Sequence, residues 1–314
     1  MTKQLYNNLK YEEGGENSQD NGDLHSEVFL NECPGGQPIP QRDMNMESQY
    51  EYGSRVGVWR ILRLFEKFNW KFTCYAVGKA VELNPVPVQA MESAGHEIAC
   101  HNYRWINYSS LSEEEERKHV HQGIKAIKDA IGKAPVGWYT GRISPRSRQI
   151  VIEEYAKLNL PLLYDSDAYN DDLPYYINNT TLKSSDPSSS SSSTSHLSSS
   201  TSHLVIPYTL DANDMKFCVP PGFTSPSAFF EYLKNTFDVL YEEGKSGGSP
   251  KFMNVGLHCR LVGKPGRLAA LKQFMEYVAG FEGVWVCTRQ EMAEHWRRVV
   301  PPLLEDKEKY RSKL

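Results

Sequence analysis

The 314-residue chain has few cysteines, and no two of them are spaced as a C-x-x-C pair. The six are Cys33, Cys74, Cys100, Cys218, Cys259 and Cys287. Scattered in this way, they make neither a disulfide framework nor a cysteine zinc site. Most lie in or beside apolar runs, where cysteine behaves as a small buried hydrophobe. We therefore expect reduced thiols and a cytoplasmic protein.

The chain also lacks long apolar runs and an excess of charge of one sign. No run approaches the roughly 20 apolar residues of a transmembrane helix. The start, MTKQLYNN, has no apolar core of a signal peptide, although secretion stays open for a chain that begins further upstream. With 35 basic and 39 acidic residues, the net charge is only -4. We therefore expect neither nucleic acid nor a membrane as a partner.

One segment departs from ordinary globular composition. In residues 184–203, thirteen of twenty residues are serine, and almost none is apolar. Such a segment cannot bury enough apolar surface to order itself. We predict a disordered insertion within a single domain that spans residues 1–314.

Short apolar runs alternate with amphipathic helical stretches along the rest of the chain. The predicted strands cover residues 5–11, 71–77, 96–101, 135–140, 160–167, 203–210, 252–258 and 283–289. The clearest helix covers residues 113–131, because Ser112 and Glu115 form a capping-box pattern and Gly132 is a stop signal. Repeated β-α units with continuously apolar strands predict a parallel sheet closed as a barrel.

Polar side chains follow the ends of five predicted strands, and the carboxyl ends of barrel strands are where active sites gather. In chain order they are Glu12 and Glu13, His101, Arg142, Asp165 and Asp167, and His258. Carboxylates, an arginine and two histidines suit acid–base hydrolysis. A purely structural role is the alternative, in which Arg142 pairs with Asp165 or Asp167 and the histidines lie in the core.

These segments resemble the polysaccharide deacetylase (NodB-like) superfamily over essentially the whole chain. The matching motifs are Glu12-Glu13 where most members have Asp-Asp, His101 after G-H-E-I, Arg142 with Pro145, the acidic and aromatic segment from Asp165 to Tyr175, and Gly256-Leu257-His258. The strings E-Y-G-S-R, G-W-Y-T-G-R and G-L-H-C-R-L-V-G-x-P-G-R are most similar to the allantoinase-type (urate-catabolism) subgroup, which includes fungal chitin-oligomer deacetylases. The resemblance implies a distorted, incomplete parallel β/α barrel and, by analogy, a homo-oligomer.

The resemblance also implies a metal site made of one acidic residue and two histidines, the second histidine four positions after the first. Here that position holds Trp105. Glu13 and His101 are the remaining candidate ligands for zinc or a similar divalent metal, although catalytic zinc usually has three protein ligands. The alternative is an enzyme without a cofactor, as the allantoinase-type subgroup is thought to be.

We expect a hydrolase of non-peptide C–N bonds. Glu12 is the candidate general base, His258 the acid that protonates the leaving nitrogen, and Arg142 the group that stabilises the oxyanion. The candidate substrate contacts are Trp105, Trp138, Asp165 and Tyr169, although the three aromatic residues could equally be core residues.

Three functions are compatible with these residues. Deacetylation of chitin oligosaccharides is placed narrowly first, and opening of the cyclic amide of allantoin is second. The third is a non-catalytic sugar-binding protein that kept the fold. Retention of the Glu12-Glu13 pair and His258 argues against it, because binding alone needs neither.

Overall fold

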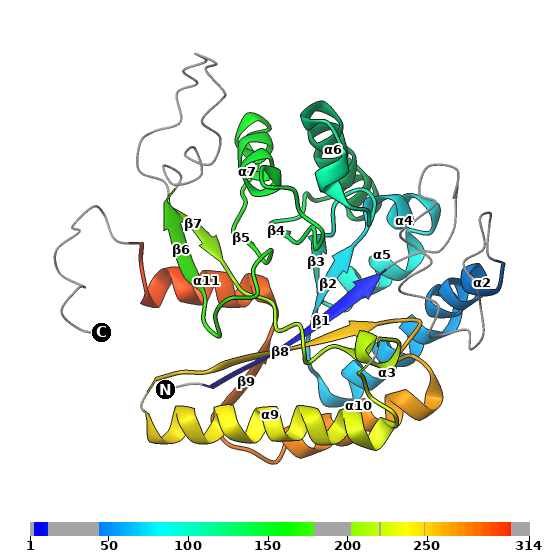
Figure 1. Ribbon diagram of the computed structural model, residues 1–314, viewed down its shortest axis with the longest axis vertical. Helices are drawn as coiled ribbons and strands as arrows, with labels where there is room; N and C mark the ends of the chain where they lie inside the picture. Colours follow the sequence, from blue (N-terminus) through cyan, green and yellow to red (C-terminus); the bar gives the residue numbers. More distant parts are fainter. Residues whose placement is uncertain (1–2, 12–43, 179–201, 220, 248, 303–314) are drawn as a thin grey trace.

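A nine-stranded, mostly parallel sheet forms the centre of the molecule. The computed structural model describes residues 3–11, 44–178, 202–219, 221–247 and 249–302. Strand order is β6-β7-β5-β4-β3-β2-β1-β8, with β9 also paired to β1, and the β6–β7 pair is antiparallel. Helices surround the sheet (Figure 1). The outermost strands, β6 and β8, do not pair with each other in the described part of the chain. The distorted, incomplete barrel is therefore confirmed, whereas full closure, predicted from the β-α repeats, is wrong.

The strands are short apart from β1 and β8. Their bounds are β1 Lys3–Tyr11, β2 Thr73–Ala76, β3 Glu97–Cys100, β4 Gly137–Trp138, β5 Tyr164–Asp165, β6 Tyr175–Asn178, β7 Ser202–Val205, β8 Phe252–His258 and β9 Val284–Cys287. The α-helices are α2 Met44–Tyr52, α3 Val58–Phe68, α4 Gly78–Leu83, α5 Val86–Ser93, α6 Glu113–Ile131, α7 Ser147–Lys157, α9 Pro226–Ser246, α10 Pro265–Val278 and α11 Arg289–Val299. A π-helical turn, η1 (Gly53–Gly57), joins α2 to α3, and two 3-10 turns are η2 (Tyr108–Ser110) and η3 (Asp214–Phe217).

Helix α6 begins and ends where the sequence predicts. The Ser112 side chain accepts a hydrogen bond from the Glu115 backbone N–H, and the Glu115 carboxylate accepts one from the Ser112 N–H. Gly132 ends the helix with φ of 78°, a left-handed conformation that favours glycine. Both signals depend only on neighbouring residues, so they can be read without the tertiary structure.

Strand β1 lies between β2 and the edge strand β8 and pairs with three strands. It pairs with β8 along residues 4–10, with β9 along residues 3–6 and with β2 along residues 8–11. Its register places Lys10 opposite His258 and Tyr11 opposite Ala76. The carboxyl end of β1 therefore runs beside the strand that carries His258. Glu12 and Glu13, which follow it, lie outside the described residues.

The predicted Ser-rich insertion corresponds to the connection between β6 and β7. Residues 179–201 lie outside the described residues, so most of that prediction stays a prediction. Its last two residues, Ser202 and His203, are the first residues of β7, so the predicted range is two residues too long. Asn178 and Ser202 are register partners in the β6–β7 hairpin.

A buried polar network fills the inside of the curved sheet. The Arg289 guanidinium, with an exposed fraction of 0 %, donates to Ser166 Oγ at 2.8 Å and to the Ile206 carbonyl at 2.7 Å. The Glu97 carboxylate accepts from Tyr164 Oη at 2.8 Å and from backbone and side-chain donors of β2 and α11. Burial raises the pKa of Glu97, and the hydrogen bonds and the Arg289 charge oppose that rise. These hydrogen bonds, and to a smaller extent the Arg289 charge, therefore offset part of the cost of burying the Glu97 carboxylate.

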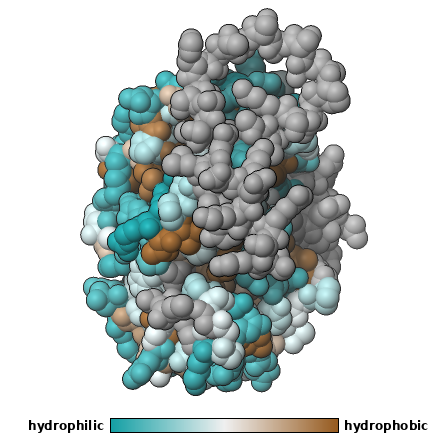
Figure 2. Space-filling view, turned by 90° about the vertical axis from the view of Figure 1, so that its left-hand side faces the viewer, coloured by the Kyte–Doolittle hydropathy of each residue, from teal (hydrophilic) through white to brown (hydrophobic). Residues whose placement is uncertain are grey.

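On the outside, an ion-pair cluster joins α6 to α7. Glu154, whose side chain is 4 % exposed, accepts from Arg117 and His121 on α6 and from Lys157 on its own helix. Burial alone would raise the pKa of Glu154, but these donors lower it to about 2. Figure 2 shows hydrophobic residues in separate small areas among hydrophilic ones on one face. No helix of the described residues is long and apolar enough to cross a membrane.

Candidate active site

His258, at the carboxyl end of β8, is held by a buried aspartate that sequence analysis did not identify. Asp214 begins η3, and its Oδ1 lies 2.6 Å from His258 Nδ1. Its Oδ2 accepts the backbone N–H groups of His258 at 2.9 Å and Val262 at 3.0 Å. Both side chains are buried. The carboxylate therefore fixes the imidazole orientation and the turn that follows β8.

Burial and neighbouring groups shift the pKa of Asp214 in opposite directions. Burial raises its pKa to about 7, while the two backbone donors and the charges of Arg260 and Arg267 lower it. A carboxylate beside Nδ1 keeps the ring hydrogen on that nitrogen and stabilises a doubly protonated ring. Nε2 is then the ring nitrogen that exchanges a proton with a bound molecule.

His101 follows β3 and is fully buried. Its Nδ1 lies 2.5 Å from the carbonyl oxygen of Tyr139. Because a carbonyl only accepts, Nδ1 carries the hydrogen, and Nε2 of the neutral ring has a lone pair. The ring stacks on that of Tyr139, with centroids 4.9 Å apart. The tautomer and the plane of His101 are therefore both fixed by Tyr139, the residue that follows β4.

A chain of contacts links the two histidines through other side chains. Tyr139 stacks on Tyr208 with ring centroids 5.0 Å apart and planes 1° from parallel. Tyr208 Oη accepts a hydrogen bond of 2.9 Å from the side chain of Asn213, the residue before Asp214. His101 thus connects through the two tyrosines to the Asp214–His258 pair. Intermediate side chains thus link two predicted residues that follow strands far apart in sequence.

Arg142 follows β4 but does not contact the aspartates proposed as its partners. Its guanidinium lies 4.6 Å from the centre of the Trp105 ring and forms no ion pair with any described residue. Asp165 is instead bound by Arg148, with contacts of 2.8 and 3.0 Å, and by His203 at 2.7 Å. The structural alternative, in which Arg142 pairs with Asp165 or Asp167, is therefore wrong. Arg142 remains a half-buried cation held against an indole face.

Asp165, the last residue of β5, and Asp167, just after it, both have structural partners. Asp165 is 2 % exposed and, although burial would raise its pKa, the charges of His203 and Arg148 lower it. Asp167 accepts backbone N–H groups of Thr140 and Gly141 at 2.7–3.0 Å. Asp165 therefore does not fit a substrate contact, because its oxygens are engaged inside the protein. Asp167 holds the backbone turn that leads to Arg142.

The predicted aromatic contacts are divided between core and surface. Trp138 is 1 % exposed, packs edge-on against Tyr155 of α7 and donates to Thr140 Oγ1 at 2.8 Å. It is a core residue, so the structure contradicts its proposed role as a substrate contact. Tyr169 is 49 % exposed, and its hydroxyl lies 2.9 Å from that of Tyr139. Trp105, beneath Arg142, is partly buried.

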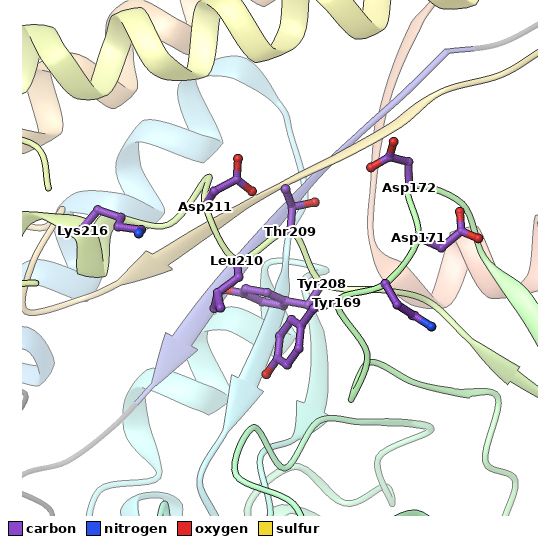
Figure 3. Close-up of a pocket in the computed structure, with 9 residues that line it drawn as sticks. Tyr169, Asp171, Asp172, Tyr208, Thr209, Leu210, Asp211 and Lys216 are labelled. Carbon is purple, nitrogen blue, oxygen red and sulfur yellow. The ribbon is translucent and has the colours of Figure 1, made fainter. Parts of the chain in front are cut away.

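A cavity of about 760 Å³ lies beside Tyr169 (Figure 3). It is formed by the segments after β5 and β7, and its lining residues are Tyr169, Asn170, Asp171, Asp172, Tyr208, Thr209, Leu210, Asp211 and Lys216. Figure 3 shows Tyr169 and Tyr208 next to each other between Lys216 and Asp211 on one side and Asp171 and Asp172 on the other. Two tyrosines thus connect the cavity to the stacked ring of Tyr139 and, through it, to His101.

The described residues do not by themselves make up a metal site. No three His, Cys, Asp or Glu side chains come together as ligands in the described ranges. The Nδ1–H of His101 is held by the Tyr139 carbonyl, as the second ring nitrogen of a metal-binding histidine usually is. The indole of Trp105 cannot replace a second histidine, and Glu13 lies outside the described residues. No catalytic step is therefore assigned to a metal ion.

Comparison with known proteins identifies the family of the chain. Residues 43–160 match the family described as Polysaccharide deacetylase. A "Putative polysaccharide deacetylase" of Schizosaccharomyces pombe is 46% identical over 293 residues, which are 92% of this chain and 88% of that protein. The crystal structure of Puue Allantoinase is 47% identical with a TM-score of 0.82, covering 96% of this chain and 92% of that one. A probable polysaccharide deacetylase from Pseudomonas aeruginosa PAO1 is 46% identical with a TM-score of 0.81 over the same shares. From its motifs, its open sheet and these relatives, the chain belongs to the polysaccharide deacetylase (NodB-like) family.

Proposed function

We propose that this chain hydrolyses an amide C–N bond with His258 as the general acid. The observation that carries the proposal is the buried Asp214–His258 pair at a carboxyl strand end, with Nδ1 and Oδ1 2.6 Å apart. An amide nitrogen leaves only when it is protonated, because its anion is too basic. A histidine whose Nδ1 is held by a carboxylate can deliver that proton from Nε2.

The other groups take the steps before nitrogen departure. Water attacks the amide carbon, and Glu12 is proposed to take its proton. Arg142 supplies positive charge for the oxyanion, and its position over the Trp105 ring supports this role. His101, whose ring is fixed by Tyr139, positions the attacking water. Collapse of the tetrahedral intermediate breaks the C–N bond while His258 protonates the nitrogen, which gives a carboxylic acid and an amine.

Chitin oligosaccharides are the first proposed substrate. The cavity of about 760 Å³ beside Tyr169 supports an extended ligand, since it lies within the range of small-molecule sites. Tyrosine faces suit the apolar faces of sugar rings, and the surrounding hydroxyl, amide and carboxylate groups suit sugar hydroxyls. In this reading, acetate is released from an N-acetylglucosamine unit.

Allantoin is the second candidate, and a different observation favours it. The chain shares 47% identity with the structure of Puue Allantoinase over 96% of its length. A small cyclic amide would use the same acid, base and oxyanion groups without filling the cavity. We place chitin oligomers first because the cavity is a feature of this chain itself.

One paired assay tests both substrates. Purified protein is incubated separately with N-acetylchitooligosaccharides and with allantoin, and free amine, acetate and allantoate are measured. His258→Gln should lower turnover by about 10²–10⁴-fold, and His295→Gln, on the distant helix α11, should not. Turnover of allantoin alone would reverse the order of substrates. Binding of the sugars without turnover of either compound would favour the non-catalytic sugar-binding function.

Metal content is measured on the same preparation. If Glu13 and His101 hold a zinc-class ion, elemental analysis should find about one ion per chain. The variant His101→Gln should then lose the ion. A metal-free protein with full activity would remove Glu13 and His101 from the metal-binding role.

A further inference from the structure

Two motif segments, one before the turn η1 and one containing His258, lie against each other in the structure. E-Y-G-S-R leads into the π-helical turn η1, and G-L-H-C-R-L-V-G contains the turn after β8. A Cβ atom added at Gly57 would lie 2.1 Å from the carbonyl oxygen of Cys259. One added at Gly263 would lie 2.1 Å from the same oxygen and 2.5 Å from Gly57 Cα. Only glycine at both positions allows the two backbones to approach this closely.

The π-helical turn and its neighbours hold the β8 turn on several sides. Residues of α2, η1 and α3 form one continuous helix, because the residues at both junctions have right-handed helical dihedral angles. The Tyr50 ring lies 4.5 Å from the Arg260 guanidinium, and the Tyr52 ring lies 3.6 Å from Lys264 Nζ. Arg60 of α3 donates a hydrogen bond to the Gly263 carbonyl. Contacts before, within and after η1 therefore converge on the turn.

That turn fixes the backbone that carries the His258 side chain. Cys259, whose carbonyl touches the two glycines, directly follows His258. The His258 carbonyl accepts from Leu261 at 2.9 Å and Val262 at 3.1 Å, and Asp214 bridges the N–H groups of His258 and Val262. In a turn closed on itself in this way, a shift of the Cys259 carbonyl moves the imidazole relative to Asp214.

We propose that Gly57 and Gly263 are positioning residues for the general acid: the missing side chains let the η1 helix rest directly on the backbone after His258 and set its place. The inference rests on the proposed function, in which His258 protonates the leaving nitrogen. The π-turn at this position is in keeping with it, since π-turns often occur at functional sites. It also gives one physical role to two motifs that lie about 200 residues apart in sequence.

The test compares two leaving groups. Gly57→Ala forces the Cys259 carbonyl away, and a displacement near 1 Å at a catalytic group costs about 10²-fold in rate. The amide substrate identified by the paired assay should lose about that factor in kcat, whereas 4-nitrophenyl acetate should change by less than about threefold, because nitrophenolate leaves without a proton. Gly266→Ala is the matched control, since a Cβ there meets nothing within 4 Å. Equal losses on amide and ester would overturn the inference.

A second variant and a second measurement test the inference if Gly57→Ala does not fold. Arg60→Met removes the hydrogen bond to Gly263 without adding a clash, and should lower amide turnover by about tenfold with ester turnover retained. The proton on His258 Nδ1 should give a far-downfield NMR resonance that shifts in Gly57→Ala or Arg60→Met but not in Gly266→Ala. An unchanged resonance in both variants would refute the positioning role. If His258→Gln cleaves the amide as well as the natural protein, the proposed function fails, and the resonance still decides the positioning.

Discussion

Replacing Asp214 by asparagine tests the role of the aspartate that holds His258, a residue that sequence analysis did not identify. The carboxylate meets three donors, the His258 ring Nδ1–H and two backbone N–H groups. An amide has one acceptor oxygen and one donor nitrogen, so Asp214→Asn cannot satisfy all three. One orientation places the amide nitrogen against the two backbone groups, and the other places it against Nδ1.

The energies of the two orientations decide the outcome. Leaving two buried backbone N–H groups without acceptors costs about 1–3 kcal/mol each. Turning the amide nitrogen toward Nδ1 avoids that cost, because the ring hydrogen can move to Nε2. The neutral ring is then a poor acid at the leaving nitrogen, since the charge that stabilised its doubly protonated form is gone. We expect kcat to fall by about 10²–10⁴-fold, which is about 3–5 kcal/mol of barrier, in a folded protein.

The assay is kcat for whichever amide the protein turns over, with thermal unfolding followed in parallel. Asp238→Asn is the control, because Asp238 is a partly exposed carboxylate on α9 paired with Lys234. A kcat within about threefold of the natural protein would show that Asp214 does not support a general acid. Recovery of turnover by an ester with a good leaving group would support the assignment.

Three other perturbations have defined outcomes. The pKa of Glu154 is lowered from 4.5 to about 2, so its carboxylate stabilises the natural protein above pH 4.5, and this stability is lost as the pH falls toward 2. Glu154→Gln should remove that contribution. Chemical unfolding of the two proteins should differ by at most about 3 kcal/mol at neutral pH and by almost nothing near pH 2. Arg142→Met should lower kcat by about 10²–10³-fold if it stabilises the oxyanion, while an unchanged kcat would exclude that role. Arg289→Leu leaves the Glu97 carboxylate buried without its compensating charge and should cost about 3–5 kcal/mol in urea unfolding. Adding Glu97→Gln should recover part of that loss, and full additivity of the two changes would contradict the proposed compensation.

Features of the fold that depend on local chemistry were predictable from the sequence. The Ser112 and Glu115 cap and the Gly132 stop gave the bounds of α6, and the apolar run of residues 252–258 coincides with β8. Strand β6 was missed because its four residues are only partly buried and are defined by pairing with β7. The π-turn η1 was also missed, since its geometry depends on a contact with a turn far along the chain.

The site was predictable to the extent that strand ends reveal it. That rule predicted His101 and His258 in one region, and a chain of contacts through Tyr139 and Tyr208 links them. Asp214 was missed because it lies in a 3-10 turn, 44 residues before its partner, and follows no strand directly. Nothing short of the tertiary structure distinguishes it from other aspartates.

The same limit explains the error at Asp165. Both Arg142 and Arg148 come shortly before it in sequence, and spacing alone does not choose between them. The first turn of α7 directs Arg148 to Asp165, whereas Arg142 lies over Trp105. His203 completes the cluster from the edge of a serine-rich segment that composition alone assigned to disorder.

The β6–β7 hairpin gives this protein a natural attachment point. Asn178 and Ser202 face each other across the hairpin, so whatever joins them starts and finishes at two neighbouring positions. A tether between fixed neighbours changes the closure entropy by only about 0.6 kcal/mol for each doubling of its length. A change in the length of the intervening sequence should therefore have little effect on the geometry around His258. A reporter domain or an affinity tag inserted there would be attached at the edge of the sheet. Relatives could gain or lose residues at this point without changing the strand ends that carry the candidate catalytic residues.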